Sequence, residues 1–100
     1  MAGMILREFR ALSKNSLRGF ATVELPSGLV IKDISMHTSN GKSWASLPAK
    51  PHIAKDGSPV MKDGKAQYLS ILQWKNRDLA DGFSAALVGL VTAEHPNALN

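Results

Sequence analysis

The chain has 100 residues, of which 44% are hydrophobic and 20% charged, and this suffices for one small domain with a thin hydrophobic core. It contains no cysteine, so disulfides, zinc–thiolate sites and iron–sulfur clusters are excluded. No apolar run approaches the roughly 20 residues that span a bilayer, and Arg7 and Glu8 interrupt the stretch where a secretion signal is apolar. We therefore expect a cytoplasmic protein without a membrane partner.

Basic residues are confined to the first 77 positions. Residues 1–77 hold all 12 Lys and Arg side chains and five of the eight acids, a net charge of 12 − 5 = +7. Residues 78–100 hold three acids and no Lys or Arg, a net charge of −3. A basic body predicts a polyanionic partner, such as nucleic acid or a membrane surface. The alternative is that the charge only keeps the protein in solution.

Four strands joined by tight turns are predicted in the first half of the chain. Polar turn signals at residues 13–16, 26–28 and 38–41 separate apolar runs at 5–12, 17–25, 29–37 and 43–47. Strand signals come first and a helix comes last. We therefore expect an α+β domain over residues 1–100, with a small, antiparallel, bent sheet of four to five strands and one C-terminal helix.

The register of the first hairpin decides which side chains share a face. If Leu12 lies opposite Leu17, then Phe9 faces Phe20, and one face interleaves these rings with arginines that suit phosphates and bases. The alternative is that both rings are buried and the register differs by one residue, which reverses the face of every side chain. Two further aromatic residues pose the same choice between core and base stacking: Trp44 and Trp74.

The chain from residue 48 to residue 66 breaks the strand pattern. It contains three prolines and two Asp-Gly pairs, which favour turns over regular structure. We expect an irregular loop or a small distorted hairpin at residues 48–66. A fifth strand is predicted at residues 67–74, where aliphatic and aromatic residues return.

A helix is predicted over residues 77–94, with Asn76 or Asp78 as its cap. Apolar residues at helical spacing form one stripe: Leu79, Phe83, Ala86, Leu87 and Leu90. Asp81 is the only charged residue between positions 79 and 93, so the side opposite the stripe also lacks charge. We therefore expect cover on two sides and a homodimer, whose predicted interface consists of Ala85, Val88, Gly89 and Thr92.

Patterns for catalysis and metal binding are absent from the sequence. The three histidines (His37, His52 and His95) lie in separate segments, without a carboxylate or a second histidine at ligand spacing. Asp33 is the only acid within an apolar strand, and a lone carboxylate makes a poor acid–base pair. No glycine-rich phosphate loop or nucleophile elbow is present. We expect no enzyme, no metal, no cofactor and no small-molecule substrate.

Nucleic acid binding is the function that the charge distribution favours. Lysines in or beside the irregular loop lie on flexible backbone, and cations just before the helix adjoin its free amide groups. The first hairpin extends this surface. The predicted phosphate-binding residues are Lys50, Lys55, Lys62, Lys65, Lys75, Arg77, Arg10 and Arg18. The alternative function is a protein-interaction or assembly module whose basic surface binds an acidic protein.

One stretch of the sequence resembles a known family. An apolar strand containing Asp33-Ile34 precedes an Asn40-Gly41 turn, and an aromatic strand from Trp44 closes in Leu-Pro-Ala-Lys at Lys50. This pattern resembles the SpoVG family (stage V sporulation protein G, septation regulator) over most of the chain. The loop is several residues longer than in that family, and the helix start is less basic. The resemblance implies a small bacterial or phage-borne dimer that binds DNA and RNA as a regulator.

Overall fold

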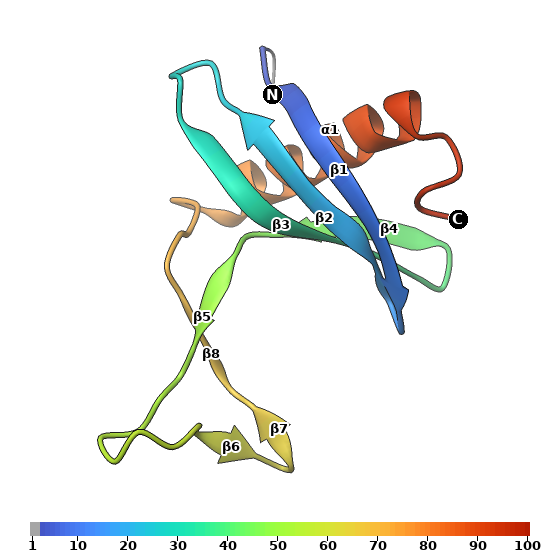
Figure 1. The fold of residues 1–100 in the computed structure, drawn as a ribbon. Coiled ribbons are helices and arrows are strands. Elements are labelled where there is room, and N and C mark those ends of the chain that lie inside the picture. Colours follow the sequence, from blue (N-terminus) through green and yellow to red (C-terminus); the bar gives the residue numbers. More distant parts are fainter. Residues whose placement is uncertain (1–2) are drawn as a thin grey trace.

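The computed structural model describes residues 3–100, which form a four-stranded antiparallel sheet, a projecting arm and one C-terminal helix (Figure 1). The sheet contains β1 (Ile5–Lys14), β2 (Leu17–Glu24), β3 (Val30–Ser39) and β4 (Lys42–Ser46), and these strands neighbour one another in chain order. The helix is α1 (Arg77–Glu94). The predicted α+β fold, with an antiparallel sheet and a C-terminal helix, is confirmed.

Asparagine and glycine residues make the tight connections between strands. Asn40 and Gly41 connect β3 to β4 with φ angles of 53° and 77°. Two consecutive positive φ values give a turn whose twist matches that of a hairpin. Asn15, with a φ of 55°, begins the turn from β1 to β2. The predicted turn signals therefore lie where the chain reverses.

Bulges in the strands decide which side chains face the helix. In β3, Asp33 has a φ of 59° and the pairing with β2 shifts by one residue, so that Ile31 and Ile34 are both buried on the same face. In β1, a bulge after Leu6 likewise places both Leu6 and Phe9 against the core. In a regular strand, residues three apart lie on opposite faces. The bulges thus add apolar side chains to the helix side.

The predicted register of the first hairpin is wrong by one residue. Phe9 lies opposite Ala21, and Phe20 lies opposite Arg10. The cause is an irregularity between Ala11 and the turn, because β1 continues to Lys14 and pairs there with Leu17. As a result Phe9 belongs to the helix side and Phe20 to the other side.

Gly19 permits a close approach inside this hairpin. A Cβ atom at this position would lie 2.5 Å from the carbonyl oxygen of Arg10 and 2.5 Å from the ring of Phe9. Only a residue without a side chain leaves room for that ring. Gly19 therefore fixes how Phe9 packs on the helix side.

Helix α1 begins at a predicted cap. The side chain of Asn76 accepts a hydrogen bond from the Leu79 N–H at 3.0 Å, which satisfies one of the free amides of the first turn. The helix ends where the His95 N–H donates to the Val91 carbonyl at 2.7 Å. The predicted bounds of 77–94 match this helix, and Asn76 is the cap.

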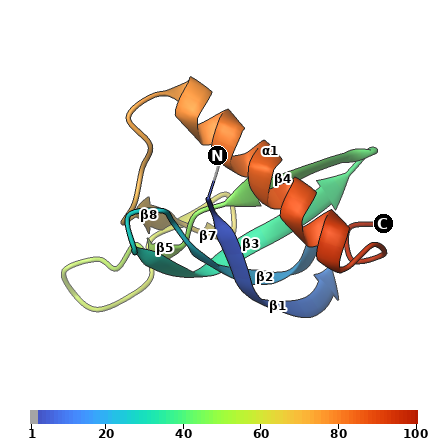
Figure 2. The same cartoon turned by 90° about the horizontal axis from the view of Figure 1, so that it is seen from above.

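The buried side of α1 is rotated relative to the predicted stripe. Phe83, Leu87 and Val91 are the buried residues of the helix, whereas Leu79 is 42% exposed. Leu79 lies in the first turn, to one side of the middle of the face that Phe83, Leu87 and Val91 form along the helix. Figure 2 shows the helix lying across the sheet. The core between the helix and the sheet consists of Met4, Ala21, Val23, Ile31, Ile34, Met36, Phe83, Leu87, Val91 and Leu99.

Residues 49–70 form an arm that projects from the sheet and lengthens the molecule to 44 Å (Figure 1). Its short strands are β5 (Ala49–Pro51) paired with β8 (Tyr68–Ser70), and β6 (Met61–Lys62) paired with β7 (Lys65–Ala66). Backbone hydrogen bonds of 2.8 Å join His52 to Gln67 and Val60 to His52. Of the two predicted alternatives for this segment, the small distorted hairpin is the one found.

The predicted fifth strand over residues 67–74 is wrong in length and in place. Only Tyr68–Ser70 is a strand, and it pairs with β5 instead of extending the main sheet. Helix α1 occupies the position beside β4, where the Ala45 N–H donates to the hydroxyl of Ser84 at 2.8 Å. The chain after Ser70 therefore passes to the start of the helix without joining the sheet.

Candidate nucleic-acid interface

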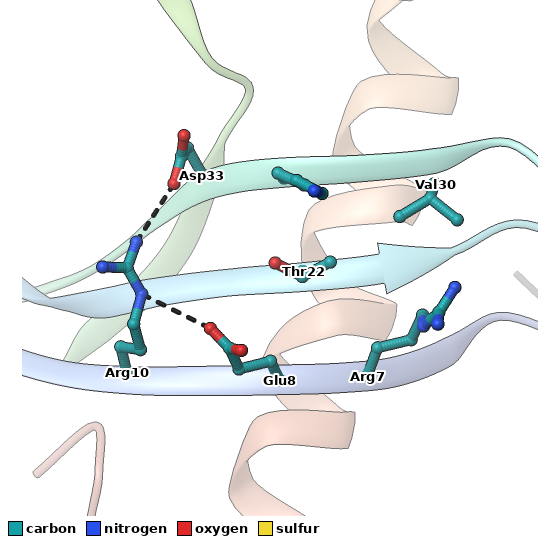
Figure 3. Close-up of a pocket in the computed structure, with 7 residues that line it drawn as sticks. Arg7, Glu8, Arg10, Thr22, Val30 and Asp33 are labelled. Carbon is teal, nitrogen blue, oxygen red and sulfur yellow. Dashed lines mark hydrogen bonds and ion pairs between the residues drawn. The ribbon is translucent and has the colours of Figure 1, made fainter.

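The face of the sheet opposite α1, here called the open face, carries charged side chains that pair with one another (Figure 3). Arg10 lies 3.4 Å from Glu8 and 3.1 Å from Asp33, and Arg7 lies 3.2 Å from Glu24. All these side chains are exposed to solvent, so each pair contributes at most about 1 kcal/mol to stability. Their main effect is on the charge of the surface, because the carboxylates neutralise the arginines of this face.

Lys32 differs from its neighbours on the open face. It lines the same hollow of about 570 Å³ as Arg7 and Arg10. Unlike these arginines, it makes no ion pair with any residue that the structure describes. Lys32 therefore keeps a free ammonium group at this end of the face.

Aromatic side chains cross the open face from β2 to β4. The guanidinium carbon of Arg10 lies 5.7 Å from the ring centre of Phe20, within the range of a cation–π contact. The rings of His37 and Trp44 are stacked, with centroids 5.4 Å apart and an interplanar angle of 9°. Phe9 and Trp74, by contrast, pack partly buried against the core. The structure thus divides the four aromatic residues that the sequence left undecided.

His37 is held in position by two hydroxyl groups. Its Nδ1 lies 3.1 Å from the Ser16 hydroxyl and its Nε2 lies 3.0 Å from the Ser35 hydroxyl. Burial lowers the pKa of His37 below its ordinary value, because the charged imidazolium would lose hydration there. The ring is therefore neutral at pH 7 and lies parallel to Trp44.

A groove of about 860 Å³ separates the open face from the base of the arm. Phe20, His37 and the ion pair of Arg10 with Asp33 line it from the sheet. Pro48, Tyr68 and Ile71 line it from the arm side. Tyr68 is 63% exposed and Ile71 is 55% exposed, although both are large apolar residues. The groove thus presents apolar and aromatic surface that the fold itself leaves uncovered.

The arm carries four of the predicted phosphate-binding residues, all of them exposed: Lys50, Lys55, Lys62 and Lys65. With Asp56 and Asp63, its net charge is 4 − 2 = +2. Asp56 accepts hydrogen bonds from the Ser58 hydroxyl at 2.6 Å and the Ser58 N–H at 2.9 Å, and these bonds lower the pKa of its carboxyl group. Asp56 thus stabilises a turn of the arm through these hydrogen bonds.

The remaining predicted residues lie in two other places. At the start of the helix, Lys75 is exposed and Arg77 lies 3.7 Å from Asp81. On the first hairpin, Arg10 is paired with carboxylates, and Arg18 donates to the carbonyl oxygens of Asn15 and Leu17 at 2.6 and 3.0 Å. The eight predicted residues thus occupy the arm, the helix start and the hairpin, and do not form one continuous patch.

Arginines and lysines differ in how they are used. Within residues 3–100, all four ion pairs are made by arginines, and none of the eight lysines takes part in one. Three lysines that the sequence analysis did not single out also belong to this unpaired set: Lys14, Lys32 and Lys42. Lys14 and Lys42 adjoin hairpin turns, so their exposure could have been predicted from the turn residues beside them.

The predicted dimer residues lie on α1 but differ in exposure. Ala85, Gly89 and Thr92 are exposed, whereas Val88 is half-buried and packs against the core of its own chain. The expectation that Val88 points away from the core is therefore wrong, because the buried side of the helix is rotated. Ala85, Gly89 and Thr92 share the outer side of the helix.

Among the described residues, no helix is long and apolar enough to cross a membrane, and no three His, Asp or Glu side chains come together as metal ligands. Comparison of the chain with protein-family models, with curated proteins and with solved structures finds no match. The resemblance to the SpoVG family therefore stays a prediction from the sequence motifs. Any functional assignment has to come from the chemistry of the surfaces described above.

Proposed function

We propose that this protein binds nucleic acid, mainly through phosphate contacts made by lysines, with modest sequence preference and a regulatory role. The observation that carries the proposal is that four exposed lysines project together from the arm and take part in no ion pair with any described residue. An unpaired, exposed ammonium group gains most from a phosphate, since no protein carboxylate has to be displaced. Lys75 just before α1 and Arg77 at its first position, which has the exposed Asp81 at 3.7 Å, extend the contact.

A second candidate function is a protein-interaction or assembly module. It is favoured by the exposed apolar side chains of the arm, among which Ile53 is 49% exposed and Met61 is 54% exposed. Exposed apolar patches mark interaction sites on many soluble proteins. A protein with this function would present the same arm to an acidic protein in place of a nucleic acid.

We further propose that the protein acts as a homodimer through the outer side of α1. The supporting observation is that Ala85, Gly89 and Thr92 offer an exposed helix surface without charge. Two copies would present two arms to one nucleic acid, and simultaneous engagement raises the apparent affinity.

The function is tested by comparing two pairs of lysines. In the arm variant, Lys62→Gln and Lys65→Gln remove two charges from the β6–β7 hairpin. In the control variant, Lys14→Gln and Lys42→Gln remove two charges that are likewise exposed, beside hairpin turns of the sheet. We expect the arm variant alone to lose affinity for DNA and RNA oligonucleotides, on the order of tenfold near physiological salt.

The salt dependence gives a second reading of the same experiment. Each lost phosphate contact reduces the slope of log affinity against log salt by about 0.7 to 0.9, so the arm variant should lose about 1.4 to 1.8. Equal losses in both variants would show that the arm has no special role. If the unaltered protein retards no oligonucleotide at about 50 mM salt, where phosphate contacts are strongest, the proposal is wrong and the protein-interaction module replaces it.

A further inference from the structure

We propose that the open face of the sheet binds the unpaired bases of a single-stranded nucleic acid, in the groove between Phe20 and Tyr68. This inference rests on the proposed function and adds to it the class of nucleic acid and the way in which it is held. In this arrangement the bases stack on the rings of the sheet, and lysines of the arm hold the phosphates.

The geometry of the rings is the first argument. Phe20 in β2, His37 in β3 and Trp44 in β4 come from three neighbouring strands, and the last two already lie parallel, at 9°. Bases stack on such flat surfaces irrespective of their sequence, because every base has a π face. Because His37 and Trp44 already stack on each other, a base can continue the stack on the outer face of either ring.

The lack of cover is the second argument. The open face has no helix over it (Figure 2), and Trp44 retains 36% of its exposure. Tyr68 lies across the groove at 63% exposure, so the groove has an aromatic ring from the sheet and another from the arm. A volume of about 860 Å³ is within the roughly 300–1,000 Å³ that ligand pockets occupy.

The distribution of charge is the third argument, and it selects a single strand over a duplex. The open-face arginines are neutralised by Glu8, Glu24 and Asp33, which leaves Lys32 as the unpaired cation among the residues described in their hollow, too little positive charge for the outer phosphates of a duplex. A duplex also keeps its bases stacked inside, where these rings do not reach them. Lys50, by contrast, stands in β5, next to Ala49 of the groove lining, and is unpaired. Charge complementarity therefore places the backbone along the arm and the bases on the sheet.

The neutral state of His37 agrees with this arrangement. Its ring nitrogens are engaged by Ser16 and Ser35, which fix the ring plane parallel to Trp44. Burial keeps its pKa low, so the ring at pH 7 adds a stacking surface and no charge. The two serines thus hold part of the platform in place before any ligand arrives.

The test compares the same substitution on the two faces of the sheet. Phe20→Leu removes an aromatic ring from the open face and keeps most of its volume, whereas Phe9→Leu makes the same change on the helix side. We expect Phe20→Leu to weaken binding of a single-stranded oligonucleotide roughly 5- to 100-fold, as loss of base stacking does. Phe9→Leu should leave that affinity within about twofold, and neither variant should change the slope against salt, because phosphate contacts remain.

Tryptophan fluorescence supplies a second measurement that does not depend on the fold tolerating Phe20→Leu. In the Trp74→Phe variant, which retains Trp44, addition of a single-stranded oligonucleotide should quench the emission. In the Trp44→Phe variant, which retains Trp74, the quenching should be clearly weaker, since Trp74 packs against Phe83 at 5.0 Å on the helix side.

The possible results distinguish this inference from the proposed function on which it rests. Equal affinity for a duplex and a single strand, with no effect of Phe20→Leu and no quenching of Trp44, overturns the inference while nucleic acid binding stands. Absence of binding to both forms overturns the proposed function and this inference together. Preference for the single strand, with loss on Phe20→Leu and quenching of Trp44, supports both.

Discussion

The two faces of the four-stranded sheet are built from the same strands but are stabilised in different ways. On the helix side, Val23, Ile34 and Met36 retain no exposure, and Phe83 of the helix retains only 2%. On the open side, side chains meet through exposed ion pairs and ring contacts, as at Arg10. Apolar burial stabilises in proportion to the area removed from water, whereas exposed ion pairs contribute little. The helix side therefore carries the stability, and the open side is free to carry a binding function.

Truncating a phenylalanine on each face measures this difference most directly. Phe83→Ala removes a fully buried ring, and we expect the free energy of unfolding to fall by about 3 to 5 kcal/mol. Phe20→Ala removes a half-buried ring from the open face and should cost about 1 kcal/mol. Urea denaturation followed by circular dichroism gives both values.

Similar losses in the two variants would contradict the comparison, since Phe20 would then be as important to the core as Phe83. A small loss for Phe83→Ala would place the stabilising contacts outside the helix–sheet interface. An intermediate loss of unfolding free energy for Phe20→Ala, about 2 kcal/mol, would indicate that the contact between Phe20 and Arg10 contributes more than surface contacts usually do.

The outer side of α1 is a third surface to compare with the two faces of the sheet, and substitutions of Gly89 test whether it forms the proposed dimer interface. A Cβ atom there meets nothing within 4 Å, so Gly89→Ala should raise the free energy of unfolding by about 1 kcal/mol through helix propensity. Gly89→Glu should convert the proposed dimer into a monomer, because it places a charge in an apolar interface. Gly89 is a better site than Val88, whose substitution also disturbs the core.

Size-exclusion chromatography with light scattering gives the mass of each form. A mass of 10.8 kDa for the unaltered protein at high micromolar concentration would contradict the dimer. A Gly89→Glu variant that stays dimeric would exclude this helix face, and would direct attention to the apolar side chains of the arm.

The parts of the fold that depend on local chemistry could be predicted from the sequence. Asn76 caps the helix through its own side chain, and Asn40-Gly41 turns the chain by its backbone preference, so both are visible without tertiary structure. The register of the first hairpin depends instead on bulges. A bulge at Asp33 is favoured by the buried isoleucines on either side of it, and a pattern of alternation does not show it.

The candidate site also has parts that could be predicted from the sequence and parts that could not. The lysines of the arm are recognisable from the sequence because each stands in or beside a turn-forming segment. The groove is not recognisable, because Phe20 and Tyr68 are far apart in the chain and meet only when the arm returns beside the open face. The neutralisation of Arg10 by Asp33 also depends on the register, and the sequence pattern gave that register incorrectly.

The smallest expected effect concerns the pH dependence of stability at His37. Its pKa is lowered in the folded protein by burial, whereas the unfolded chain keeps the ordinary value of 6.5. The unfolded state therefore binds the proton more readily, and stability falls as the pH drops from 6.5 through the lower folded value. Well above pH 6.5 both states are neutral, so stability there is independent of this group.

The measurement is the free energy of unfolding at pH 7.5 and at pH 5.5, in the unaltered protein and in His37→Gln. The variant retains His52 and His95, so the difference between the two pH dependences isolates His37. We expect the unaltered protein to lose more stability on acidification than the variant. Identical losses would mean that the His37 ring is hydrated despite its stacking on Trp44. A larger loss in the variant would mean that the folded state binds the His37 proton more readily than the unfolded state. Since the ring lies on the open face, a confirmed effect would show that water is partly excluded there even without a covering helix.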